Sequence, residues 1–305
     1  INPDGSELLN LTDSPDSQEG GPQVSKTGNQ VTYTSNASGV TTVWAMNSDG
    51  SNQRQVSELA ATGPSWTPGG QISFRAALEG GTFEFRVVPA SGGPSTLLAP
   101  ASGSDSPPRF TTGGSWLYTS FAPVEVDSGT FTTQVFVVDG EVENQVTASS
   151  PALSSNSFPS WSPDGQSILY NRTDSTPGFG NDDDIYMVPR NGGPEVQLTN
   201  TPGPVDERWA SLSPDGTKLI YHGEDADNDF FSQFLSIADS DGSNPVPIDT
   251  PTLVSATFPD WATVGSEEPE LRAGFTATAP KSSRATRPIK VTLRCIGDTR
   301  CAVSY

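Results

Sequence analysis

Histidine and cysteine are nearly absent from this chain of 305 residues, which contains one histidine and two cysteines. A metal site built from several histidines is therefore excluded, and any Ser-His-Asp triad would have to use His222. The sequence also contains no GxSxG, Walker A, HExxH or CxxCH motif. We interpret His222, which follows the apolar run LIY, as an ordinary histidine at the end of a strand.

Basic residues and long apolar segments are scarce as well. The 16 lysines and arginines stand against 36 aspartates and glutamates, so the net charge is −20. Nucleic acids are bound by clustered basic side chains and anionic membranes repel an acidic protein, so we expect neither as a partner. No stretch approaches the roughly 20 apolar residues that a membrane-spanning helix needs, so direct membrane insertion is not expected. We attribute the acidity to solubility, and the main alternative is binding of divalent cations.

Turn-forming residues, in contrast, are abundant. The chain contains 30 glycines and 27 prolines, and only 17% of its residues are charged. Such a composition interrupts helices frequently, whereas short apolar clusters separated by turns are typical of strands. The sequence therefore predicts an all-β protein whose core is built from many short strands.

A repeated pattern organises most of the chain. It consists of an apolar anchor, a tight turn and an alternating apolar segment, as in PSWSPDGQSILY at 159–170 and ASLSPDGTKLIY at 210–221. The anchors lie 42 to 51 residues apart, at Val24, Trp66, Phe110, Trp161, Leu212 and Trp261. Pro-Asp-Gly is a favoured turn sequence, so we interpret Asp164 and Asp215 as structural rather than catalytic residues. The tryptophan anchors are interpreted as packing residues.

Each unit continues with a loop, a further apolar run and a second glycine turn, as in IYMVPRNGGPEVQLT at 185–199. Four antiparallel strands repeated every 40 to 50 residues are the signature of a β-propeller blade, so six anchors predict six blades. The succession of SPDG, I-x-Y, I-Y-x-M and L-T motifs resembles the TolB-like, WD-related propeller repeat over residues 1–264. That resemblance implies the fold but leaves the function open, because the family includes scaffold, periplasmic binding and enzyme-accessory propellers.

The two ends of the repeat suggest how the ring closes. INPDGSELLNLT at 1–12 matches the third and fourth strands of a blade, and PDWA at 259–262 matches only the first. We therefore expect a sixth blade split between the termini. Its second strand would come from a segment removed before Ile1, from another chain or from a local rearrangement. Residues 265–305 are expected to form a linker and a short C-terminal β segment that resembles the start of a bacterial surface-type immunoglobulin-like domain.

Acidic loops of the fourth and fifth units supply the candidate site. Propeller topology places these two loops next to each other on one face, and oxygen ligands from neighbouring loops are what calcium prefers. The proposed ligands are Asp182, Asp183, Asp184, Asp225, Asp227 and Asp229. The alternative is that these loops are simply solvated. Aromatic residues in the same loops would form a binding surface, namely Phe179, Phe230 and Phe231.

The remaining expectations concern the cysteines and the function. Cys295 and Cys301 are close enough in sequence to form a disulfide across a hairpin, which would indicate an oxidising compartment, and free thiols are the alternative. The sequence thus favours an extracellular, cell-surface or periplasmic binding or scaffold propeller for a protein or glycan, without catalysis. The alternatives are a subunit of an extracellular assembly completed by copies of itself, and a hydrolase or lyase that uses carboxylates on the loop face.

Overall fold

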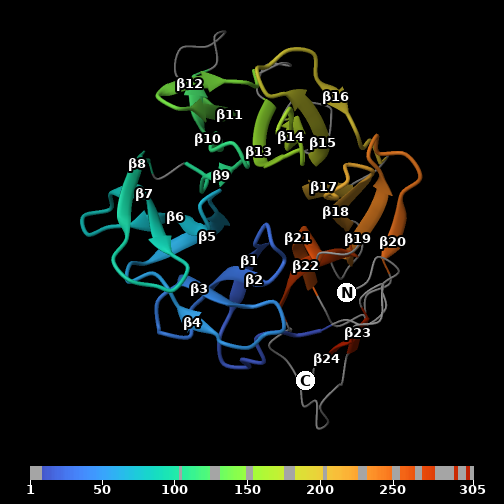
Figure 1. The fold of residues 1–305 in the computed structure, drawn as a ribbon. Coiled ribbons are helices and arrows are strands. Elements are labelled where there is room, and N and C mark those ends of the chain that lie inside the picture. The colour runs from blue at the N-terminus through green and yellow to red at the C-terminus, as the bar shows by residue number, and fades with distance from the viewer. Residues whose placement is uncertain are drawn as a thin grey trace.

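The computed structural model describes most of the predicted repeat and part of the C-terminal segment. The described residues are 9–102, 105–123, 131–148, 154–174, 183–201, 205–225, 232–248, 255–264, 270–278, 292–294 and 300–302. All regular elements within these ranges are β-strands, which confirms the all-β prediction. The strands form separate antiparallel sheets arranged around a central axis, as a β-propeller requires (Figure 1).

Five sheets have four strands each, and each sheet is one blade. The first blade contains β1 (Glu19–Val24), β2 (Gln30–Ser35), β3 (Thr42–Asn47) and β4 (Arg54–Gln55). The second contains β5 (Ala61–Trp66), β6 (Gln71–Ala77), β7 (Phe83–Pro89) and β8 (Thr96–Ala101). The third contains β9 (Arg109–Phe110), β10 (Trp116–Pro123), β11 (Phe131–Asp139) and β12 (Val142–Gln145). The fourth contains β13 (Ser154–Trp161), β14 (Ser167–Asp174), β15 (Asp183–Pro189) and β16 (Val196–Gln197). The fifth contains β17 (Val205–Leu212), β18 (Lys218–Asp225), β19 (Ser232–Asp239) and β20 (Val246–Ile248).

A further sheet lies between the fifth and first blades. It pairs β21 (Ser255–Val264) with β22 (Glu270–Thr278), and a separate pair joins β23 (Thr292–Arg294) to β24 (Arg300–Ala302). In the register of the first pair, Trp261 lies opposite Ala273, so β22 takes the place of the second strand that had no sequence match after Trp261. Of the three expected sources of that strand, the local rearrangement agrees with this pairing, because β22 follows β21 in the same chain. The expected boundary at residues 264 and 265 falls between the paired strands and stays a prediction.

The N-terminal segment is described only from residue 9 onward. Residues 1–8 lie outside the described residues, and residues 9–12 form no strand. The expected strand is therefore not found at residues 9–12, and the expectation that residues 1–8 contribute to a split blade remains a prediction. The same holds for the immunoglobulin-like resemblance after residue 265, because most of that segment lies outside the described ranges.

The hydrophobic core is divided into layers between adjacent blades. Strand alternation sends neighbouring side chains to opposite faces of a sheet. Ile168 on β14 therefore packs in one cluster with Leu117 of the third blade, whereas the next residue, Leu169, packs in another with Leu219 of the fifth. All four side chains are fully buried. Each blade is thus stabilised on both faces, which explains the near-continuous apolar runs in the second strands.

The SPDG turns connect the first and second strands of their blades, as predicted. In the fourth blade, Gly165 adopts a φ of 66° and its N–H donates to the carbonyl oxygen of Ser162 at 2.8 Å. The Asp164 carboxylate accepts hydrogen bonds from the Ser162 hydroxyl and the Gln166 N–H. These bonds hold the pKa of Asp164 below its usual value. Asp215 repeats the arrangement with Ser213 and Thr217. The predicted place of both aspartates in the turns is confirmed.

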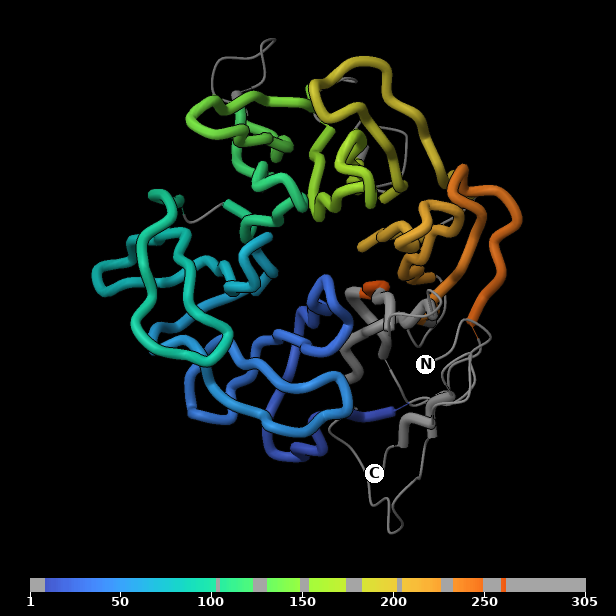
Figure 2. Tube along the Cα trace, in the orientation of Figure 1, coloured from blue at the N-terminus to red at the C-terminus, as the bar shows by residue number. Residues whose placement is uncertain are grey.

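The first strand of each sheet lies nearest the axis (Figure 2). The tryptophan anchors link these strands in pairs, since each indole N–H donates to a backbone carbonyl of the preceding first strand. Trp66 donates to Gln23 at 3.0 Å, Trp161 to Arg109 at 3.0 Å and Trp261 to Ser211 at 3.1 Å. The anchors thus pack as expected, and they also fix the spacing of neighbouring blades around the axis.

Candidate functional site

The acidic loops are only partly described. Asp182, Asp227 and Asp229 lie outside the described residues, as do Phe179, Phe230 and Phe231. Within the part of the chain that is described, no three histidine, cysteine, aspartate or glutamate side chains are grouped to hold a metal ion. The calcium site and the aromatic surface therefore stay predictions. Cys295 is also undescribed, so the disulfide with Cys301 stays one too.

Three members of the acidic set are described. Asp225 is the last residue of β18, opposite Val205 and Ser232, and the other two are engaged between the fourth and fifth blades or within the fourth. Asp183 is buried and forms an ion pair with Arg208, which also pairs with Asp206 at 2.6 Å. Burial raises the pKa of Asp183, and the neighbouring Thr173 and Arg208 partly offset that effect. The Asp184 carboxylate accepts a hydrogen bond from the Gln197 amide at 3.0 Å. Arg208, which the sequence analysis did not single out, thus joins the first strand of the fifth blade to the third strand of the fourth.

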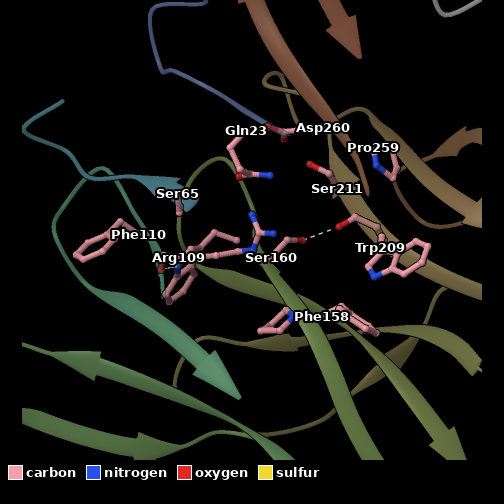
Figure 3. A pocket seen from close by; sticks show the side chains of 13 residues that line it. Gln23, Ser65, Arg109, Phe110, Phe158, Ser160, Trp209, Ser211, Pro259 and Asp260 are labelled. Carbon is pink, nitrogen blue, oxygen red and sulfur yellow. Dashed lines mark hydrogen bonds between the residues drawn. The ribbon is translucent and has the colours of Figure 1, made fainter. Parts of the chain in front are cut away.

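A cavity of about 190 Å³ opens at the axis, where the first strands converge (Figure 3). Six of its lining residues have the same place in the repeat, immediately before the apolar anchor. They are Gln23, Ser65, Arg109, Ser160, Ser211 and Asp260. Because alternation turns the anchor into the layer between blades, the preceding side chain faces the axis. Sequence reasoning missed this site, although the aligned repeat contains the signal in a single column.

Arg109 is the basic residue of this column. It is half-buried, and Figure 3 shows its side chain reaching from β9 into the cavity toward Gln23 and Ser160. Among the described residues, no side-chain or backbone oxygen accepts a hydrogen bond from its guanidinium, and no carboxylate forms an ion pair with it. Desolvation lowers the pKa of Arg109, while the charge of Asp260 acts in the opposite direction. An arginine nevertheless remains protonated in proteins.

Asp260 is the acidic residue of the column. Its carboxylate accepts a hydrogen bond from the Val24 N–H at 3.2 Å, which joins β21 to β1 across 236 positions of sequence. Burial raises the pKa of Asp260 to about 6, and the bond from Val24 and the charge of Arg109 limit the rise. The Asp260 side chain therefore links β21, near the end of the repeat, to β1, the first strand of the first blade.

Two aromatic residues in the cavity wall have strained backbones. Phe158 and Trp209 have φ values of 50° and 56° at β-bulges in the first strands of their blades. The equivalent residues of the first two blades are Gly21 and Gly63, both with a φ of 56°. Glycine adopts this conformation freely, whereas another residue is destabilised by roughly 1–2 kcal/mol. The rings of Phe158 and Trp209 meet edge to face, with centroids 5.4 Å apart, and Phe158 remains 44% exposed.

His222 lies behind this wall and does not line the cavity. It is fully buried, its ring centroid is 4.8 Å from that of Trp209, and neither ring nitrogen has a hydrogen-bond partner in the described structure. Burial, together with the charge of Arg208, lowers the pKa of His222 to about 4. The imidazole is therefore neutral at pH 7 and packs as an aromatic ring. His222 lies in the interior of β18, opposite Arg208 and Leu235, so its expected position at the end of a strand is wrong.

These features define a class: an antiparallel β-propeller with a small polar cavity on its axis and aromatic residues in the cavity wall. The model of the PD40 family, the TolB beta propeller domain, matches residues 1–265, and the chain belongs to this family. No curated protein matches the sequence. In the described residues, no helix is long and apolar enough to cross a membrane.

Solved structures agree with this fold. Putative TolB from Agrobacterium tumefaciens is 19% identical with a TM-score of 0.59, and the match covers 76% of this chain and 80% of that one. TolB from Acinetobacter baumannii is 18% identical with a TM-score of 0.60, over 83% of this chain and 62% of that one. An oligogalacturonate lyase in complex with manganese is 10% identical with a TM-score of 0.52, over 88% and 78% of the two chains. At these identities the likeness concerns the fold alone.

Proposed function

We propose that this protein is a non-catalytic binding propeller that holds a segment of a partner protein at the mouth of its axial cavity. The observation that carries the proposal is the pair of aromatic side chains, Phe158 and Trp209, kept in left-handed conformations at the cavity wall. Strained backbones persist where surrounding structure and function both require the side chain. Partly exposed aromatic residues are also the usual anchors of protein interfaces.

The lining of the cavity favours binding over catalysis. Arg109 and Asp260 are the only charged residues among those that line it in the described structure. Hydrolysis of a glycoside by the common route requires two carboxyl groups on opposite sides of the bond, and this wall provides one. Asp260 is moreover engaged by the N–H of Val24. The hydrolase or lyase alternative therefore has less support than the binding module.

The proposal includes a closed ring of six blades, with β21 and β22 as part of the sixth. The hydrogen bond from Val24 to Asp260 and the bond from Trp261 to Ser211 place β21 between the first and fifth blades. Because β22 provides the second strand, the ring does not need that strand from a neighbouring copy. We further propose that the protein functions outside the cytoplasm, in keeping with its acidity and with the predicted disulfide.

A selection experiment tests the binding function. The full chain is used to select peptides from a random displayed library and, in parallel, is applied to a glycan array. We expect selected peptides to bind Phe158→Ala at least about tenfold more weakly than the unchanged protein, as for an interface anchor. Phe121→Ala is the matched control, because Phe121 is 58% exposed on β10 but does not line the cavity.

Three results would contradict the proposal. The library could provide no binder, the selected peptides could bind both variants equally, or only glycans could bind in a Phe158-dependent manner. The last result would show that the axial face recognises a carbohydrate rather than a protein segment. Thermal unfolding of both variants shows whether a loss of binding reflects a loss of folding.

A further inference from the structure

Arg109 differs from every other arginine whose side chain is described. The other six each donate a hydrogen bond to a side chain or to a backbone carbonyl; they are Arg54, Arg75, Arg86, Arg172, Arg190 and Arg208. Arg109 alone lines the cavity with a guanidinium, a group of five N–H donors, for which the described residues provide no acceptor. A partly desolvated guanidinium with unfilled donors is a site for an anion.

The other polar groups described in the cavity wall do not accept hydrogen bonds from the Arg109 guanidinium. The Ser160 hydroxyl donates to the carbonyl oxygen of Ala210 at 2.7 Å, and the Gln23 amide donates to the carbonyl oxygen of Pro22 at 3.0 Å. Asp260 lies near enough to influence the pKa of Arg109, yet no ion pair joins the two. The wall is thus internally bonded, and the guanidinium is left facing the open space.

The size and walls of the cavity restrict the anion. A volume of about 190 Å³ is below the 300–1,000 Å³ typical of sites that enclose a drug-sized ligand, so it admits one small group. Phe110, Phe158 and Trp209 provide apolar contact beside the arginine. A planar carboxylate on a short apolar stem fits this combination, because a guanidinium pairs with a carboxylate through two parallel N–H···O bonds.

From these observations we infer that Arg109 binds a carboxylate group of the ligand inside the axial cavity, while Phe110, Phe158 and Trp209 contact the stem that carries it. The inference rests on the proposed function, because it specifies the chemical group that a partner places in the site. That group is a side-chain carboxylate or a chain end of a protein, or else a free small carboxylic acid. The net charge of −20 means that attraction for an anion must come from this local cation.

Two probes of equal shape test the inference on the full chain. Benzoate has a planar carboxylate on an aromatic stem, and benzamide replaces the carboxylate by a neutral amide. Titrations followed by saturation-transfer NMR should show that benzoate binds about tenfold more tightly than benzamide, since charge-assisted hydrogen bonds are about twice as strong as neutral ones. Arg109→Gln should bind both probes equally. Arg86→Gln, which removes the same charge outside the cavity, should keep the preference for benzoate.

A second variant keeps the test decisive if Arg109→Gln does not fold. Asp260→Asn removes the opposing charge while its amide oxygen can still accept from Val24, so benzoate affinity should rise about two- to fivefold. Equal binding of the two probes by the unchanged protein, no binding of benzoate, or an unchanged preference in Arg109→Gln would overturn the inference. Binding of inorganic phosphate in place of benzoate would also overturn it, because the site would then take another class of anion.

The source of the carboxylate follows from the selected peptides. Amidation of the peptide C-terminus tests the chain end, and Asp→Asn or Glu→Gln changes in the peptide test its side chains. Peptides that need Phe158 but are indifferent to Arg109→Gln would refute the carboxylate and leave the binding function intact. A benzoate preference without any selected peptide would instead retain the carboxylate site, as one for a small acid, and refute the protein partner.

Discussion

Replacement of Phe158 by glycine should be tolerated better than replacement by alanine. At most strand positions the order is opposite, because glycine loses more conformational freedom on folding and is less stable than alanine by about 0.5–1 kcal/mol. At Phe158 the φ of 50° adds a cost of roughly 1–2 kcal/mol for alanine and none for glycine. Both variants lose the same contact with Trp209, so this loss does not affect the comparison.

Ser155, on the same strand and without a positive φ, is the control position. The four variants are compared by urea denaturation, with equal slopes confirming that the unfolded states are alike. The glycine-minus-alanine difference in unfolding free energy should be about 1–2 kcal/mol more favourable at Phe158 than at Ser155. Equal differences at the two positions would refute the argument that the backbone is strained. Phe158→Gly should still bind selected peptides poorly, because the anchor is lost.

Three further predictions concern the bulges and the buried charges. Gly63→Ala should lower the free energy of unfolding by about 2–4 kcal/mol in urea denaturation, because the added Cβ would lie 2.0 Å from Pro107. Gly21→Ala, with the same φ but no neighbour within 4 Å, should lower it by only about 1 kcal/mol. Similar losses in the two variants would contradict this account of the packing. Burial lowers the pKa of His222 from 6.5 to about 4. The stability that depends on the neutral imidazole is therefore complete above pH 6.5 and falls by about 3 kcal/mol as the pH decreases to 4. In urea denaturation across that range, His222→Phe should lose less stability than the unchanged protein, and an equal loss would refute the lowered pKa. Burial raises the pKa of Asp260 from 3.8 to about 6, so the folded protein holds this proton more tightly than the unfolded chain and loses stability as the pH rises through this range. Asp260→Asn should therefore be more stable than the unchanged protein by about 1–3 kcal/mol above pH 6 and equally stable below pH 3.8. A difference in unfolding free energy that stays constant with pH would exclude this titration.

Local patterns explain how much of the fold could be predicted. The SPDG turns and the alternating segments depend on backbone angles and hydrogen bonds within a few residues, as at Ser162, Asp164 and Gly165. The repeat spacing then indicated the blades, and the family match over residues 1–265 agrees with it. The position of β22 was less predictable, because ELRAGFTAT lacks the repeat motif and is recognised as a second strand only by its pairing with β21.

The candidate site was harder to predict because its residues have no local pattern of their own. Runs of aspartate attract attention in a sequence, yet Asp183 is paired with Arg208 from another blade. Arg109, in contrast, stands in the unremarkable segment PRFTTGG and becomes distinctive only because no described group accepts its hydrogen bonds. Comparing the residues before each anchor would have found it, since five neighbours in that column are neutral or acidic.

The strands, the turns and the repeated blade could be inferred from the amino-acid order, because they depend on side-chain alternation and on residues close together in the chain. The lining of the axis became visible only in the folded ring, where Gln23 and Asp260 line one cavity although 236 residues lie between them in the chain. The reason is physical. Whether a buried polar side chain finds an internal partner depends on the distances between blades, and those distances are set by packing around the whole ring.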